Sequence, residues 1–236
     1  GRREEAAEDL VWLVRTGDSD DYGALSRLAR ALGLTGAQTF MAYNAPRGEG
    51  AHPSLRYPVT FRTPVGGWRV DPALAFAHAL QESNFRESVV SPAGAIGLMQ
   101  IMPITQREYA ASINMSSGAD LKDPAVNLAF GQRTLESLNS SSFTQGKLPK
   151  IMAAYNAGLT PVGRWNTQVR DQGDPLLYME SIPYWETRGY VAIVTRNYWM
   201  YERQAAAPSP SRQALAMNRW PAFPEAKPSN PRFTSR

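Results

Sequence analysis

A helix that carries one acidic side chain and runs directly into a glycine-rich loop constrains this chain more than any other feature of its sequence. Asp71 followed by Pro72 is typical of an N-cap and a first helical position, and residues 73–85 contain no helix breaker. The pattern predicts a helix of about three to four turns with apolar residues on both sides, which is typical of a buried helix. Glu82 lies near its end and is therefore expected in apolar surroundings.

Glu82 is the candidate catalytic residue because burial changes the acidity of a carboxyl group. A low dielectric disfavours the ionised form and raises the pKa. A Glu that stays protonated near neutral pH can act as a general acid, as in lysozyme-type glycosidases. The alternative is a Glu at a helix C-terminus that points into water, which is the commoner case for a helical Glu. The sequence that follows Glu82 favours the catalytic interpretation.

The glycine-rich segment 91–103 is expected to form a loop or a short β-hairpin beside that helix. Gly94 and Gly97 permit positive φ angles and a close approach of the backbone. Ser and Gln side chains hydrogen-bond neutral polar groups such as hydroxyls and N-acetyl amides, and Met offers an adaptable apolar contact. The segment therefore supplies candidate sugar-binding residues, which are Ser91, Gln100 and Met102.

Several further blocks share the spacing and composition of one known family. The blocks are Glu82-Ser83 with Phe85, Ser91-Pro92-Ala93-Gly94-Ala95, Gly97-Leu98-Met99-Gln100-Ile101-Met102-Pro103, Ala154-Tyr155-Asn156-Ala157-Gly158, and Glu180-Ser181-Ile182-Pro183 with Glu186-Thr187-Arg188-Gly189-Tyr190-Val191. They resemble the soluble lytic transglycosylases, whose lysozyme-like SLT domain cleaves peptidoglycan. The resemblance covers residues 68–204, and several blocks in the right order make it specific.

The resemblance implies a fold, a reaction and a substrate. The fold would be mainly α (α+β), a lysozyme-like catalytic domain with a small β-hairpin region, preceded by a short α-helical segment. The reaction would cleave the β-1,4 bond between N-acetylmuramic acid and N-acetylglucosamine and form a 1,6-anhydromuramyl end. Glu82 would act first as acid and then as base, without a cofactor or a metal. The substrate would be the glycan strands of peptidoglycan.

The resemblance also implies roles for residues outside the loop. Tyr155 would hydrogen-bond the catalytic carboxyl group, with Asn156 beside it at the same helix end. Glu180 would lie on the cleft and contact the substrate, although a Glu at this position could equally cap the following helix. Ser91, Gln100 and Met102 would hold the muramyl unit.

The chain divides into four parts by composition and periodicity. Three helical segments are expected at residues 4–15, 22–32 and 35–43, where apolar residues recur at helical spacing. The predicted parts are an α-helical N-terminal segment at 1–45, an extended connector at 46–70, the transglycosylase domain at 71–204 and an irregular, Pro-rich tail at 205–236 that either wraps the domain or stays mobile.

Composition limits the other function classes. The chain has no Cys and two His, which argues against a thiolate or His-rich metal centre. We expect His52 at the surface and His78 as a packed structural residue. The net charge of +4 would suit an anionic polymer, but we find no basic run, zinc pattern or aromatic RNA motif that would indicate nucleic acid. We expect a periplasmic or envelope enzyme whose export signal lies outside this sequence; protein partners in the envelope stay open.

A missing second carboxylate separates the remaining alternatives. Most glycosidases use two carboxylates, but residues 88–107 contain none. One acid is consistent with attack by the 6-hydroxyl of the sugar itself. A goose-type lysozyme-like hydrolase is the main rival, with Glu87 as the base for water. A non-catalytic muropeptide-binding module of the envelope is the rival from another class.

Overall fold

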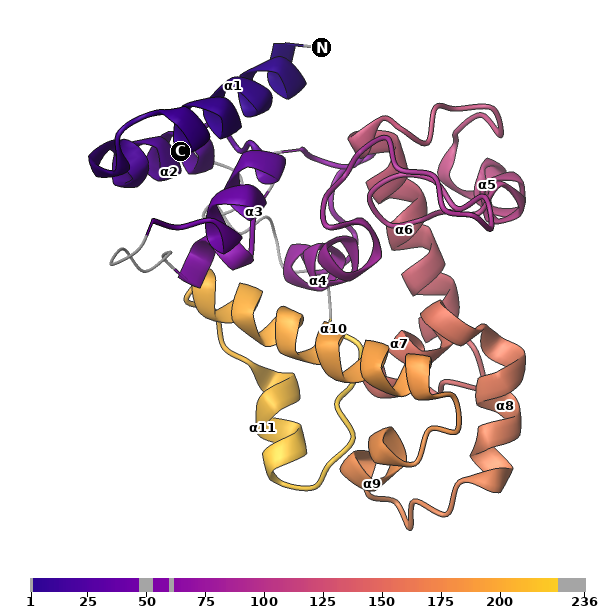
Figure 1. The fold of residues 1–236 in the computed structure, drawn as a ribbon. Helices are drawn as coiled ribbons and strands as arrows, with labels where there is room; N and C mark the ends of the chain where they lie inside the picture. The colour runs from indigo at the N-terminus through magenta and orange to yellow at the C-terminus, as the bar shows by residue number, and fades with distance from the viewer. Residues whose placement is uncertain (1, 47–52, 60–61, 225–236) are drawn as a thin grey trace.

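The computed structural model describes residues 2–46, 53–59 and 62–224, and the regular elements within these ranges are helices (Figure 1). His52 and parts of the predicted connector lie outside the described residues. The α-helices are α1 (Arg2–Thr16), α2 (Tyr22–Ala31), α3 (Thr35–Tyr43), α4 (Pro72–Ser83), α5 (Pro103–Tyr109), α6 (Pro124–Asn139), α7 (Leu148–Ala157), α8 (Leu159–Gln168), α9 (Pro175–Glu180), α10 (Trp185–Gln204) and α11 (Pro210–Ala216). Short 3-10 turns lie at Ser19–Asp21, Pro53–Arg56 and Ala111–Ile113. The mainly helical fold class is therefore confirmed.

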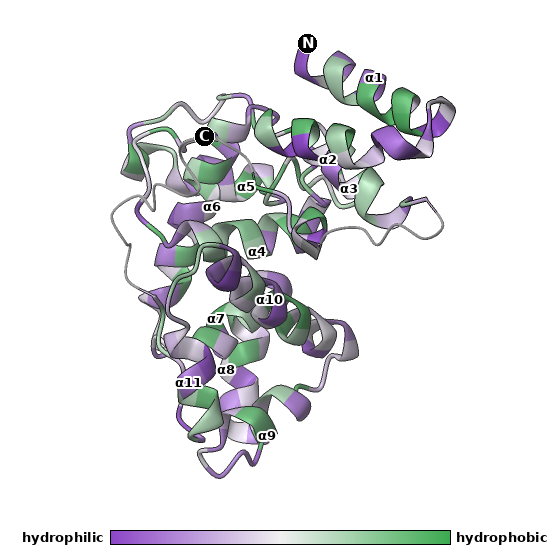
Figure 2. Cartoon of the chain, turned by 90° about the vertical axis from the view of Figure 1, so that its left-hand side faces the viewer, coloured by the Kyte–Doolittle hydropathy of each residue, from purple (hydrophilic) through white to green (hydrophobic). Residues whose placement is uncertain are grey.

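The helices gather around two apolar cores. Helices α1, α2 and α3 lie together at one end of the molecule, and α8, α9 and α11 lie at the other (Figures 1 and 2). The first three helices share a small core around Ala29, Ala37 and Met41. The larger core is built mainly by α4, α6, α7 and α10. No helix among residues 2–46, 53–59 and 62–224 is both long and apolar enough to span a bilayer.

Aspartate caps start three of the helices, as the Asp-Pro pairs in the sequence indicate. The side chain of Asp71 accepts a hydrogen bond from the backbone N–H of Ala73 at 3.0 Å, and Asp123 and Asp174 cap α6 and α9 in the same way. Each cap satisfies backbone N–H groups that have no partner inside the helix. Helix α8 has no such cap, because it begins at Leu159 directly after Gly158.

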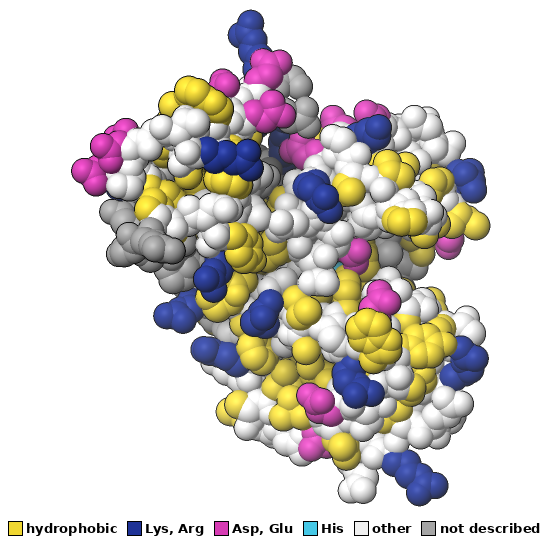
Figure 3. All heavy atoms as spheres, viewed as in Figure 1, with side chains coloured by type: hydrophobic (Ala, Val, Ile, Leu, Met, Phe, Trp, Pro, Cys, Tyr) yellow, Lys and Arg dark blue, Asp and Glu magenta, His cyan; other side chains and the backbone are white. Residues whose placement is uncertain are grey.

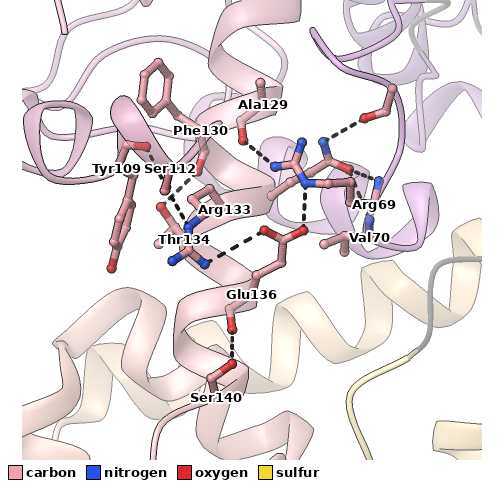
Figure 4. A network of polar contacts seen from close by, with 12 residues as sticks. Arg69, Val70, Tyr109, Ser112, Ala129, Phe130, Arg133, Thr134, Glu136 and Ser140 are labelled. Atoms are coloured by element: carbon pink, nitrogen blue, oxygen red, sulfur yellow. Dashed lines mark hydrogen bonds and ion pairs between the residues drawn. The ribbon is translucent and has the colours of Figure 1, made fainter. Parts of the chain in front are cut away.

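Helix α4 is held in place by the segment that precedes it. The backbone N–H groups of Arg69 and Val70 donate to Oε1 of Gln132 on α6, at 2.7 and 3.1 Å. The Arg69 guanidinium forms an ion pair with Glu136, one helical turn further along α6, at 2.8 Å (Figure 4). These contacts fix the chain immediately before the Asp71 cap, so they set the position at which α4 enters the core.

The predicted β-hairpin is wrong in form. Within the described residues, segment 90–101 makes two isolated antiparallel bridges, Val90 to Ile96 and Ile96 to Ile101, and no regular strand. The φ angles of Gly94, Gly97 and Gln100 are +86°, +77° and +49°. Three left-handed residues within seven positions turn the chain repeatedly, so a strand ladder has no room to extend.

The expectation of an irregular C-terminal tail is also wrong in part. Residues 210–216 form α11, because Pro210 starts a helix that carries the buried Leu215. The chain then returns to the domain, where the backbone N–H of Leu148 donates to the Pro221 carbonyl at 2.8 Å. Residues 225–236 lie outside the described residues. The 205–224 segment therefore packs against the domain.

Asn127 provides a test of how the loop is held. Its side chain accepts a hydrogen bond from Met99 N–H and donates to the carbonyls of Ile96 and Leu121, each at 2.8 Å. Asn127→Ala leaves these buried groups unpaired, so we expect it to lower the free energy of unfolding by about 3 kcal/mol. Urea denaturation measures this. Asn166→Ala, which removes contacts nearer the surface, serves as control; an equal loss in both variants would contradict a special role for Asn127.

Candidate active site

Glu82 lies in the last turn of α4 and its side chain is half-buried. The hydroxyl of Tyr190 on α10 donates a hydrogen bond to Glu82 Oε1 at 2.6 Å. Helices α4 and α10 pack against each other, and Tyr190 is 5% exposed. The carboxyl group is therefore held between two helices while part of it stays accessible.

The surroundings of Glu82 raise its pKa from 4.5 to about 7. Burial is the largest cause, because it disfavours the charged form. The hydrogen bond from Tyr190 lowers the pKa, and the like charge of Glu186 raises it again. At neutral pH the group thus populates both protonation states, as a residue that gives and then takes a proton must.

The hydroxyl of Tyr190 also contacts a buried histidine. Nδ1 of His78, one turn before Glu82 on α4, lies 2.8 Å from the Tyr190 hydroxyl. His78 is fully buried, and burial lowers its pKa to about 3, so the imidazole is neutral in the working pH range. The prediction that His78 is a packed structural residue agrees with this burial.

Tyr155 does not make the hydrogen bond that the family resemblance implies. Its hydroxyl donates to the Met99 carbonyl at 2.8 Å, and a tyrosine hydroxyl has only one proton to donate. Tyr190 donates to Glu82 instead. The ring of Tyr155 lies against the His78 ring, with 4.6 Å between centroids, and the charge of Glu82 contributes to its raised pKa. Tyr155 therefore lies close to the site and supports the loop.

The segment 91–103, which carries three candidate residues, is attached to the end of α4. The hydroxyl of Ser83 donates to the Leu98 carbonyl at 2.8 Å, which fastens the loop to the last turn of the helix. Ser91 Oγ accepts from the Ala95 N–H at 3.0 Å, and Gln100 Nε2 donates to the Gly97 carbonyl at 2.9 Å. Met102 is half-buried at the N-cap of α5. All three residues remain partly accessible.

Asn156 and Glu180 lie in different settings. Oδ1 of Asn156, near the end of α7, accepts a hydrogen bond from the Thr187 hydroxyl on α10 at 2.6 Å. It therefore ties α7 to the first turn of α10, three residues before Tyr190. Glu180 is the last residue of α9 and is exposed. Contact with substrate stays a prediction for both residues.

Sequence reasoning missed Tyr190 and Glu186 as parts of the site. Both residues belong to a sequence block on which the family resemblance rests, and neither was assigned a role at the site. Their separation of four residues places them on one face of α10. Tyr190 follows Glu82 by 108 residues in the chain, so the two cannot be paired without knowledge of the fold. Helical spacing could have placed Glu186 and Tyr190 on the same face, but it could not have identified Glu82 as their neighbour.

Other ionisable groups near the site are few. Glu186 is exposed in the first turn of α10. Glu87, the expected base of a hydrolase, lines a separate cavity of about 430 Å³, together with Leu34 at the N-cap of α3.

The described residues contain no group of three or more His, Cys, Asp or Glu that could hold a metal ion. In the space-filling view the molecule narrows between its upper and lower halves, and acidic side chains lie at this waist (Figure 3).

The raised pKa of Glu82 predicts how the free energy of unfolding depends on pH. The native carboxyl binds a proton up to about pH 7, whereas the ordinary carboxyl of the unfolded chain loses it near pH 4.5, so Glu82 destabilises the fold progressively as pH rises between these values. We expect Glu82→Gln, which is neutral throughout, to be more stable than the parent by about 2 kcal/mol at pH 8 but not at pH 4.5. Denaturation at the two pH values measures the difference; a pH-independent effect would contradict the raised pKa.

Comparison with known proteins agrees with this geometry. Residues 61–177 match the family model described as "Transglycosylase SLT domain". The soluble lytic murein transglycosylase of Escherichia coli K12 is 36% identical over 140 residues, which cover 58% of this chain and 21% of that protein. The chain thus spans about a fifth of this curated relative.

Solved structures give the same result. The 70 kDa soluble lytic transglycosylase of Escherichia coli superimposes with a TM-score of 0.68 at 27% identity, covering 92% of this chain and 35% of that one. An inactive Glu-to-Gln variant of the lytic transglycosylase Slt from Pseudomonas aeruginosa superimposes with a TM-score of 0.63 at 29% identity, covering 84% and 32%. Residues 61–177 therefore match the transglycosylase SLT domain, and the chain is similar to the soluble lytic transglycosylases in both sequence and fold.

Proposed function

We propose that this protein is a peptidoglycan lytic transglycosylase in which Glu82 is the single general acid and then the base. The observation that carries the proposal is a half-buried carboxyl group with a pKa of about 7, fixed by one tyrosine and accessible on one side. The relatives named above are lytic transglycosylases, and one of them is inactive when a Glu is replaced by Gln. A periplasmic or envelope location belongs to the same proposal.

The reaction needs one proton to move twice. Protonated Glu82 gives its proton to the glycosidic oxygen between N-acetylmuramic acid and N-acetylglucosamine, and the bond from that oxygen to the muramyl C1 breaks. The N-acetyl group of the substrate assists the departure from within the sugar. The Glu82 carboxylate then removes the proton of the muramyl 6-hydroxyl as O6 bonds to C1. The products are a 1,6-anhydromuramyl end, a free N-acetylglucosamine 4-hydroxyl and an enzyme in its starting state.

In this proposal the remaining candidate residues bind the substrate or support the loop that binds it. Ser91, Gln100 and Met102 hold the muramyl unit, since their accessible side chains lie on the loop fastened to the end of α4. Tyr155 keeps that loop in place through the Met99 carbonyl. Asn156 and Glu180 extend the binding surface toward the more distant parts of the substrate.

A hydrolase is the second candidate because a carboxylate other than Glu87 influences Glu82. The charge of Glu186 raises the pKa of Glu82, so an exposed second acid lies within electrostatic range. Glu186 could activate water from such a position. A non-catalytic muropeptide-binding module is less consistent with the structure, because a binder has no need for a desolvated acid with a near-neutral pKa.

Replacement of the acid tests the proposal directly. We expect Glu82→Gln to reduce turnover of purified sacculi at least about 100-fold, because proton transfer to the leaving oxygen is lost. Co-sedimentation with sacculi should stay unchanged, since the amide has nearly the same shape. Mass spectrometry of the parent's products should show anhydromuramyl ends. Reducing ends that contain an added water would instead identify a hydrolase, and an active Glu82→Gln variant would refute the assignment of the acid.

Glu186→Gln separates the two reactions. We expect this variant to retain anhydromuramyl products, while the basic limb of its pH profile for kcat/KM moves to lower pH, because removal of a like charge lowers the pKa of Glu82. Arg196→Gln, at an exposed position further along α10, controls for changes in surface charge. Turnover that disappears in Glu186→Gln and persists in the control would show that Glu186 is the base of a hydrolytic reaction.

A further inference from the structure

Glu82, Tyr190 and His78 form a continuous chain of hydrogen bonds. Tyr190 Oη lies 2.6 Å from Glu82 Oε1 and 2.8 Å from His78 Nδ1. His78 and Glu82 lie one turn apart on α4, so the tyrosine of α10 is held between two residues of the same helix. The other His78 nitrogen, Nε2, is buried and has no hydrogen-bond partner among the described residues.

The number of protons decides the direction of these bonds. Tyr190 has one proton, and an ionised Glu82 can only accept, so the tyrosine proton points to Glu82 Oε1. The bond between Tyr190 and His78 then requires a proton on Nδ1. A neutral imidazole has one N–H, so Nε2 carries none. This arrangement suits the site, because a buried acceptor without a partner is tolerated more often than a buried N–H without one.

We infer that His78 is a positioning residue that donates from Nδ1–H to Tyr190 and thereby fixes which oxygen of Glu82 carries the proton. The inference rests on the function proposed above. With Tyr190 aimed at Oε1 in both protonation states, the mobile proton resides on Oε2. The same oxygen therefore gives the proton to the glycosidic oxygen and takes one from the 6-hydroxyl.

The other groups around Glu82 leave this role to His78. Tyr190 and Glu186 face it from α10, Tyr155 lies nearby on α7, and segment 88–102 has no charged side chain. Both tyrosines have raised pKa values, mainly through burial, and His78 stays neutral. Among the groups with shifted pKa values, Glu82 is the one whose pKa lies near neutral. His78 therefore acts through its tautomer and not through its own protonation.

Nitrogen-15 NMR of the protein labelled at histidine tests this without an activity assay. The chain has two histidines, so a His78→Asn sample assigns the spectrum. We expect His78 to be neutral with its proton on Nδ1 from pH 5 to 9, and its shifts to follow the titration of Glu82 with a midpoint near 7. That response should vanish in Glu82→Gln and Tyr190→Phe. A proton on Nε2, or shifts that ignore Glu82, would overturn the inference.

Kinetics of matched variants provide the second measurement. We expect His78→Phe to lower kcat roughly tenfold, less than the loss of the acid itself, with KM within about twofold. Its basic limb should move to higher pH, because a weaker bond from Tyr190 lowers the pKa of Glu82 less. His78→Asn, which can place an N–H near the Nδ1 position, should restore most of both values. Tyr201→Phe, which removes another buried hydroxyl of α10, should change neither.

The outcomes distinguish this inference from the proposed function. An inactive Glu82→Gln variant together with parental kinetics in His78→Phe would overturn the role of His78 and leave the catalytic acid in place. An active Glu82→Gln variant would remove the proposed function, while the NMR result would still report on the hydrogen-bond chain. If His78→Phe does not fold, the NMR experiment on the parent protein decides alone.

Discussion

The packing of α4 against α10 is the contact on which the site depends. It removes water from around Glu82, and it brings the hydroxyl of Tyr190 to 2.6 Å from this carboxyl group as a hydrogen-bond donor. Desolvation raises the pKa of the acid while the tyrosine limits that rise. One helix pair therefore sets both the acidity and the orientation of the reacting group. The cap at Asp71 and the contacts of Arg69 with α6 fix how α4 enters this pair.

The loop after α4 depends on the same core through polar contacts. Asn127 of α6, Ser83 of α4 and Tyr155 of α7 each bind a backbone group between Ile96 and Met99. A loop without regular strands is thus held from three helices. This explains how a segment with three left-handed residues can keep a defined shape at the end of α4.

Much of the fold and the burial of the candidate acid Glu82 could be predicted from the sequence, because their causes are local. Asp-Pro caps and helical periodicity mark α4, α6 and α9, and the apolar neighbours of Glu82 within α4 already indicate burial. The predicted β-hairpin was wrong because a glycine-rich sequence is compatible both with isolated turns and with a regular β-ladder. Helix α11 was missed because a Pro-rich composition hides a seven-residue helix. The partners of Glu82 and Tyr155 depend on contacts between distant helices, which no local pattern encodes.

The central claim is that the fold makes Glu82 a weak acid. Carbon-13 NMR of the side-chain carboxyl groups, in protein labelled at glutamate and assigned with Glu82→Gln, measures its titration directly. We expect a midpoint near pH 7. A midpoint near 4.5, the ordinary value for a glutamate in water, would contradict the account, because Glu82 would then be ionised when the glycosidic oxygen needs its proton.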